Sequence, residues 1–137
     1  MILAIHSTKG GNKTDNKDFH KIGRSSKMKG KRGELEAVRL FKDNGYEVHR
    51  TVQYNGRSPA GAPDLEGIPG LHIEVKRVER LNIQEAIDQT TRDHKPGTLR
   101  AVFHRKNNCE WLVTLPATDF FRIFREYEGG NNNEHDR

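Results

Sequence analysis

Two carboxylates and a lysine lie close together in the segment 62–76, and side chains of these types can take part in metal-dependent hydrolysis of a phosphodiester bond. Asp64 follows Pro63, and further on Glu74 and Lys76 are separated by the single residue Val75. Carboxylate oxygens are ligands that Mg²⁺ and Mn²⁺ prefer. Such a metal lowers the pKa of a bound water and neutralises charge on the scissile phosphate. A lysine supplies a compact positive charge that stabilises developing negative charge or orients the attacking water.

The run 71–76 alternates in a way that predicts a β-strand with two different faces. Its apolar residues share one face and can enter a core. Glu74 and Lys76 share the other face and should lie roughly 6–7 Å apart along the strand. His72 is on this second face too, where a surface position is expected.

A turn at Pro69-Gly70 is expected to bring Asp64 back to the side of this strand. Asp64 and Glu74 would then share one cation, with the backbone carbonyl of Val75 as a third ligand. A simpler interpretation also fits, in which Asp64 is a turn residue and Glu74 belongs to a charged, solvated strand face.

A third carboxylate, Glu34, falls on the apolar stripe of a helix expected over about 33–44. The stripe recurs at the helical spacing from Glu34 and consists of Ala37, Val38 and Phe41. A carboxylate on the buried side of a helix needs a partner, and a metal cluster would supply one. Alternatively, a glutamate in the first turn complements the helix dipole at the fringe of the core.

Composition favours a single domain with a small apolar core. The chain has 137 residues, which is the size of a single domain, and no run is long enough to span a membrane. The apolar opening segment is too short for a secretory signal. The lone Cys109 excludes an internal disulfide and a multi-cysteine zinc site. We therefore expect a cytoplasmic location, in the host cytoplasm if the protein is viral.

Positive charge is concentrated at the N-terminal end. Residues 1–33 carry nine Lys/Arg and only two Asp/Glu. Such an excess favours a polyanion partner, although a solvated, mobile tail would explain it equally well. We expect a basic flexible arm over residues 1–32, a folded domain over 33–128 and a disordered polar tail over 129–137.

The order of expected elements defines the fold class. After the first helix, the pattern predicts strands at 46–52, near 64–67 and at 71–76, a helix at 83–94 capped by Asn82, strands at 99–105 and 110–115, and a helix at 120–127. Residues 55–61 are expected to form a loop near the site. The order helix, three strands, helix, two strands, helix predicts a central mixed β-sheet flanked by helices.

At this point the chain resembles the PD-(D/E)xK nuclease superfamily. The motifs that carry the resemblance are Pro63-Asp64, Glu74-Val75-Lys76 and Glu34 on an upstream helix. More narrowly, segments 29–41 and 44–50 are similar to the basic residues, first helix and next strand of the archaeal-type Holliday junction resolvases and their phage relatives. The resemblance spans about 27–124. It implies a restriction-endonuclease-like αβββαββα nuclease domain over 33–128.

The resemblance implies a magnesium-dependent homodimer with two metal sites, each cutting one strand of a branched DNA in recombination and repair. It implies Glu34, Asp64 and Glu74 as the acids of the metal site and Lys76 as the catalytic lysine, and Mn²⁺ is expected to substitute for Mg²⁺. Expected DNA contacts, to branched or duplex DNA, are Lys27, Lys29, Lys31, Arg32, Arg50, Arg57 and Arg77.

Gln84 and Gln89 lie on the helix that follows Lys76, where related nucleases often place a glutamine near the active site. Each also fits the polar side of an ordinary amphipathic helix. Two other functions stay open for the whole chain. One is another nuclease of the superfamily, such as a restriction-like, flap or nicking enzyme, and the other is a non-catalytic nucleic-acid-binding module.

Overall fold

The computed structural model describes residues 15–134 and places the side chains of residues 23–131. Within this part of the chain there are three helices and five strands. In chain order they are α1 (Asp15–Asp43), β1 (His49–Arg50), β2 (Leu65–Glu66), β3 (Leu71–Arg77), α2 (Ile83–Asp93), β4 (Leu99–Arg105), β5 (Leu112–Thr114) and α3 (Ala117–Glu134). The order helix, three strands, helix, two strands, helix is the one that the sequence predicts.

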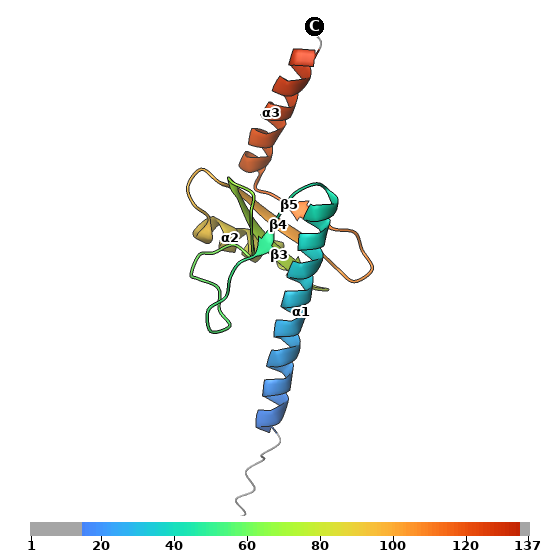
Figure 1. The fold of residues 1–137 in the computed structure, drawn as a ribbon, viewed down its shortest axis with the longest axis vertical. Helices are drawn as coiled ribbons and strands as arrows, with labels where there is room; N and C mark the ends of the chain where they lie inside the picture. The colour runs from blue at the N-terminus through green and yellow to red at the C-terminus, as the bar shows by residue number, and fades with distance from the viewer. Residues whose placement is uncertain (1–14, 135–137) are drawn as a thin grey trace, which may run out of the picture.

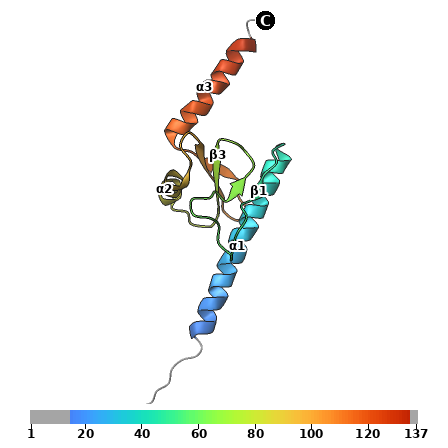
Figure 2. The same cartoon turned by 60° about the vertical axis from the view of Figure 1, so that its left-hand side comes forward.

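The strands form one mixed sheet in the order β1-β2-β3-β4-β5. The central strand β3 runs parallel to β4, and the other neighbouring strands are antiparallel. Helices α1 and α2 cover opposite faces of the sheet, while α3 leaves the sheet at one end (Figures 1 and 2). The expected α/β fold with a central mixed sheet flanked by helices is confirmed.

The core forms where the apolar stripe of α1 packs on the sheet. Ala37 and Phe41 contribute from the helix, and Leu65, Ile73 and Val75 contribute from β2 and β3. Burial of a large apolar side chain stabilises a fold by about 1.5–3 kcal/mol, so this small cluster supplies much of the force that holds α1 on β3. The predicted apolar stripe of the helix is confirmed.

Two glycines permit close approaches that fix the geometry around the sheet. A Cβ added at Gly33 would lie 2.8 Å from the Cβ of Arg77, so the backbone of α1 rests almost directly on the end of β3. Gly67 has a φ of 131°, and a Cβ there would lie 2.5 Å from the carbonyl oxygen of Glu47. Only a residue without a side chain fits at either point.

Helix α1 begins much earlier than expected. It starts at Asp15 instead of about residue 33, so residues 15–32 are helical and the expectation of an extended arm is wrong for them. This segment contains no proline, and each of its glycines costs a helix only about 1 kcal/mol. Residues 1–14 of the expected arm lie outside the described residues.

Helix α3 also runs beyond its expected end. It continues through Gly129-Gly130 to Glu134, so the expectation of a disordered tail is wrong for residues 129–134, and 135–137 lie outside the described residues. Strand β1 is shorter than the predicted 46–52. Across the helices of residues 15–134, none is both long and apolar enough to cross a membrane.

The local signals around α2 and the last hairpin are confirmed. Asn82 caps α2, and its side-chain oxygen accepts the backbone N–H of Glu85 at 3.2 Å. The turn between β4 and β5 passes through Asn108, whose φ is 56°. Asparagine tolerates this left-handed conformation better than most residues, which is why the Asn-Asn pair marks the turn.

The close approach at Gly33 gives a test of the packing. Gly33→Ala is expected to lower the free energy of unfolding by about 1–3 kcal/mol, because the new methyl group would meet Arg77 and push α1 away from β3. Gly30→Ala is a matched control, since a Cβ at Gly30 has nothing within 4 Å and should stabilise the helix by about 1 kcal/mol or less. Urea unfolding measures both. Equal stability of the two variants would contradict the close packing.

Candidate functional site

Strand β3 carries the central residues of the site on its α2 side. Alternation places Glu74 and Lys76 on the face opposite the α1 core, as the sequence predicts. Because α2 covers this face, it is buried as well: Glu74 is 2% exposed and His72 is 5% exposed. The expectation of a surface position for His72 is therefore wrong.

Asp64 lies beside Glu74, at the point where the chain enters β2. The backbone N–H of Asp64 donates to the carbonyl of Ile73 at 2.9 Å, which pairs this segment with β3. The backbone N–H of Val75 donates back to Asp64 Oδ2 at 2.8 Å. The carboxyl groups of Asp64 and Glu74 lie close enough for Glu74 to raise the pKa of Asp64. The turn after β2 thus returns Asp64 to the strand in the manner that the sequence predicts.

The two neighbouring carboxyl groups oppose each other electrostatically. Burial and, next, the negative charge of Glu74 raise the pKa of Asp64 to about 7, although the Val75 N–H acts in the opposite direction. Glu34 adds a smaller repulsion, which shows that it is near the pair. A proton held between the two groups relieves this repulsion, and a cation would do the same.

Glu34 has a partner other than the Asp64–Glu74 pair. Its Oε2 accepts a hydrogen bond from Nε of Arg50 on β1, and both side chains are largely buried. Side chains of Asp, Glu, His and Cys in the described part of the chain do not gather in any group of three that could hold a metal. The structure therefore joins two of the three predicted acids, and the roles of Glu34 as a ligand and Arg50 as a DNA contact stay predictions.

The two glutamines of α2 have different positions. Lys76 Nζ donates to Gln89 Oε1 at 3.3 Å, so Gln89 reaches the site from the helix that covers it. Gln84 instead donates to Asp88 at 2.8 Å on the exposed side of α2. Of the two predicted accessory residues, only Gln89 contacts a predicted site residue.

His72 is a site residue whose contact the sequence reasoning missed. Its Nε2 lies 3.2 Å from Glu74 Oε1, and both side chains are almost fully buried. Strand alternation had placed His72 on the face of Glu74, which was the available signal. Because α2 covers this face, the side chains of His72 and Glu74 are in direct contact, and this contact limits rotation of the Glu74 carboxylate.

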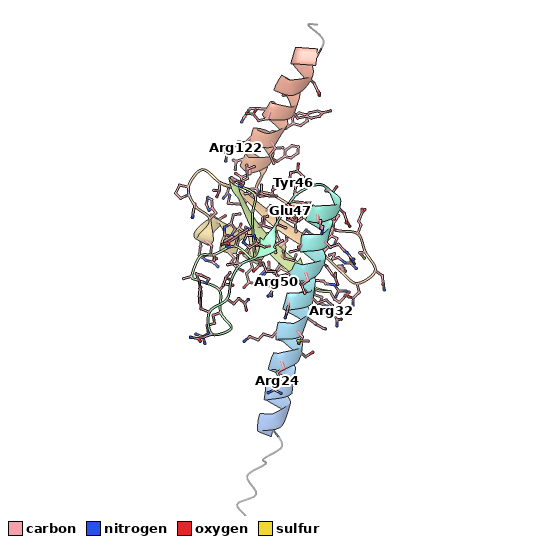
Figure 3. All side chains as sticks on the ribbon, in the orientation of Figure 1. Arg24, Arg32, Tyr46, Glu47, Arg50 and Arg122 are labelled. Carbon is pink, nitrogen blue, oxygen red and sulfur yellow. The ribbon has the colours of Figure 1, made fainter. Side chains whose placement is uncertain are left out.

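The expected DNA contacts of α1 lie on the half of the helix that projects from the sheet. Figure 3 shows Arg24 and Arg32 along this half, with Arg50 nearer the sheet. The four predicted contact residues of the helix are all exposed: Lys27, Lys29, Lys31 and Arg32. Their exposure fits contact with a polyanion.

The loop between β1 and β2 reaches this basic helix. Tyr54 and Arg57 close the loop through two backbone hydrogen bonds of 2.8 and 3.0 Å. A Cβ added at Gly56 would lie 2.9 Å from Lys27 Nζ, so the loop tip touches the projecting half of α1. Arg57 is exposed on this loop. The expected loop is confirmed, and the structure places its tip beside the basic residues of α1.

Arg77 was predicted to contact DNA, and in the structure it forms an ion pair with Glu36 of α1. It lies on the α1 side of β3, and its Nε donates to Glu36 Oε2 at 2.9 Å. Nη1 of Arg105 lies 3.8 Å from the same oxygen. Arg77 thus links β3 to α1 through a carboxylate, while its contact with DNA stays a prediction.

The comparisons with known proteins give a structural likeness and no sequence match. The sequence matches no family model and no curated protein. In three dimensions the chain is similar to Hjc, a Holliday junction resolvase from the archaeal hyperthermophile Archaeoglobus fulgidus, with a TM-score of 0.46 and 21% sequence identity. The likeness covers 64% of this chain and 72% of the other. It assigns neither a family nor an activity to this chain.

The raised pKa of Asp64 predicts how stability depends on pH in metal-free buffer. The ordinary value is 3.8 and the folded value is about 7, so the folded chain keeps a proton that the unfolded chain releases between these limits. This stabilising contribution is complete below about pH 4 and is lost as the pH rises through about 7. Asp64→Asn, which stays neutral, should therefore gain stability relative to the wild type over this range. Urea unfolding at a series of pH values measures the difference, and a constant difference would contradict the prediction.

Proposed function

We propose that this chain is a magnesium-dependent DNA endonuclease whose active centre is formed by Asp64, Glu74 and Lys76. The observation that carries the proposal is a pair of neighbouring carboxyl groups, Glu74 buried on β3 and Asp64 half-buried just before β2, with Lys76 next along the strand face of Glu74. A protein that needed only a stable sheet would gain nothing from two acids in contact, because burial of like charges is costly.

The donor atoms of the site suit a hard divalent cation. Asp64 and Glu74 would hold Mg²⁺, and the backbone carbonyl of Val75 is the proposed third protein ligand. Mn²⁺ fits the same oxygen ligands. When bound, the metal supplies a lowered pKa for a coordinated water and neutralises charge on the scissile phosphate.

The remaining contacts hold the reacting groups in place. The Val75 N–H holds one oxygen of Asp64, and the ring of His72 contacts one oxygen of Glu74. Lys76 is oriented by Gln89, and we assign its ammonium group to the attacking water or to the charge that develops on the phosphate. Side chains held by neighbours in this way lose less entropy when substrate binds.

Branched DNA is the substrate that we propose, and a four-way junction in particular. Residues 15–32 of α1 extend roughly 27 Å at the rise of an α-helix, which is about eight base pairs of duplex. The exposed lysines of this half would follow the phosphates of one arm, while the loop that carries Arg57 lies beside it. We propose that two copies of the chain act together, each cutting one strand, as part of recombination and repair.

A second function has two observations in its favour. Glu34 is engaged by Arg50, and residues 15–134 contain no three-ligand group for a metal. A non-catalytic module that binds branched DNA through its basic helix would fit these facts. Titration calorimetry with Mg²⁺ separates the two functions, because such a module would bind DNA without binding the metal at Asp64 and Glu74.

Cleavage assays test the proposed active centre. With Mg²⁺, the wild type should cut a mobile four-way junction by paired nicks, in preference to a linear duplex of the same sequence. Asp64→Asn and Glu74→Gln should reduce cleavage to background, and Lys76→Ala should reduce it about a hundredfold or more, while junction binding persists. Glu66→Gln is the matched control, because Glu66 is an exposed carboxylate on the adjacent strand. Full cleavage by Glu74→Gln would overturn the assignment, and equal cutting of linear DNA would favour a restriction-like or nicking enzyme.

The two glutamines of α2 provide a test of how Lys76 is positioned. Gln89→Ala should lower the rate of the cleavage step about 10–100-fold with little change in DNA affinity, as is typical when a group that orients an active-site residue is removed. Gln84→Ala on the same helix should leave the rate unchanged. Single-turnover cleavage measures both variants. Equal rates for them would show that Gln89 does not orient the lysine.

A further inference from the structure

A hollow of about 400 Å³ lies beside the proposed active centre, where the C-terminal end of α2 approaches the start of β3. It is lined in part by His72, which is 5% exposed and whose Nε2 lies 3.2 Å from Glu74 Oε1. Because His72 and Glu74 are alternate residues of one strand, they lie roughly 6–7 Å apart along β3. A molecule in the hollow would therefore lie one side chain away from the proposed cation site.

The walls of the hollow are two loops that hydrogen bonds hold in place. In the loop after α2, the backbone N–H of Thr98 donates to the carbonyl of Lys95 at 3.1 Å. The backbone N–H of Leu99 donates to the carbonyl of Gly70 at 2.7 Å, which ties this loop to the turn between β2 and β3. Because both walls are fixed, the hollow exists before a ligand binds, and less free energy is lost in ordering the protein on binding.

The lining is apolar and carries more negative than positive charge. Its apolar residues are Pro63, Leu65, Ile68, Pro69 and Leu71, and its Asp, Glu, Lys and Arg residues are Glu66, Asp93 and Lys95. Two carboxylates against one ammonium group disfavour a phosphate. An apolar wall with a few polar groups suits a neutral ligand that has apolar faces and hydrogen-bond donors at its edge. The bases of DNA have this chemistry.

Glu66 stands at the outer edge of the hollow. Its carboxylate is 44% exposed and lies 3.5 Å from Nε2 of His49 on the neighbouring strand. This side chain therefore has a partner on the solvent side, and no contact with an occupant of the hollow is assigned to it.

We propose that the hollow receives a base of the DNA substrate, turned out of the helix beside the phosphate that is cut. This inference rests on the proposed function and names the feature of branched DNA that the site recognises. Turning a base out costs least where its pairing or stacking is already incomplete. A nucleotide at the branch point of a four-way junction lacks continuous stacking on one side, whereas a nucleotide within a linear duplex does not. The hollow would thus favour branched DNA without reading a particular sequence.

His72 would link the bound base to the active centre. One side of its ring lines the hollow, and its Nε2 contacts the Glu74 carboxylate. A base that packs against this ring would restrict its motion further and so hold Glu74 in one orientation. A linear duplex, which keeps its bases stacked, would leave the hollow empty and Glu74 less restricted.

The base analogue 2-aminopurine, which becomes more fluorescent when it leaves the base stack, detects the proposed event. The analogue is placed at each branch-point nucleotide of a four-way junction in turn, and the full chain is added in buffer with EDTA so that no cleavage occurs. At least one position should brighten on binding, and the same analogue in a linear duplex should not. If no branch-point position brightens, the proposal is overturned.

Substitutions that fill the hollow from opposite walls show whether the base enters it. Lys95→Trp and Pro69→Trp should abolish the brightening, because both residues line the hollow and are exposed, so an indole can enter it. Thr98 contacts the backbone carbonyl of Lys95, which the substitution keeps, and far-UV circular dichroism checks that each variant is folded. Lys42→Trp, at an exposed position in the last turn of α1, is the matched control for the lost charge and should brighten like the wild type. Brightening that persists in both filled variants would overturn the proposal.

An abasic nucleotide at the brightening position measures what the base contributes. It should weaken junction binding by the wild type about tenfold, as is typical for the loss of one base contact. The same change should have little effect on Lys95→Trp, whose hollow has no room for the base. Fluorescence anisotropy in EDTA measures both affinities. An equal loss for the two proteins would show that the base is contacted elsewhere and would overturn the proposal.

Cleavage with Mg²⁺ separates this inference from the proposed nuclease. If the base enters the hollow but no chain cuts DNA, the base site stands and the nuclease proposal fails. If the wild type cuts junctions but binds abasic and complete junctions equally well, the nuclease proposal stands and the base site fails.

Discussion

The hydrogen bond from the Val75 backbone N–H to Asp64 Oδ2 is the contact on which the site depends. It joins the segment before β2 to the middle of β3 and uses a backbone donor that cannot rotate away. Because it holds Asp64 against the strand, the carboxyl group meets that of Glu74 instead of pointing to solvent. The turn between β2 and β3 then needs only to be short and well defined, which Gly70, with a φ of 79°, allows.

Helix α1 has one half packed on the sheet near the acids and another half that projects from the sheet with exposed basic residues. Ala37 and Phe41 fix one half of the helix on the sheet, and the absence of a side chain at Gly33 lets the helix approach β3 closely. Glu34, next along the helix, therefore comes near Asp64. The other half extends past the sheet with its basic residues exposed, so a single rigid element relates the position of the acids to that of the positive charge.

Periodicity in the sequence correctly predicted which residues share one face of a helix or strand. It failed for features that depend on contacts between elements far apart in the sequence. The alternation of β3 and the stripe of α1 determine which residues share a face, and both predictions agree with the structure. The burial of His72 was missed because it depends on α2 covering that face, which no local pattern encodes. The helix ends were misjudged because glycine weakens a helix without necessarily ending it. The partner of Glu34 depends on the pairing of β1 with β2, which sequence spacing did not reveal.

The acid pair fits the proposed cation site better than it fits a role in stability. In the metal-free chain above about pH 7, the neighbouring carboxylates repel each other and this lowers the stability of the fold. The packing of α1 and α2 on β3 offsets this unfavourable energy. Binding of a cation at such a site would be favoured by two contributions, the attraction between the cation and the carboxylates and the loss of repulsion between the carboxylates. Protons would compete with the proposed cation for the two carboxyl groups, so the affinity for the cation should rise with pH until Asp64 is fully ionised. An acid pair that weakens the free protein is consistent with the proposed cation site, because selection for stability alone would favour apolar side chains at these positions.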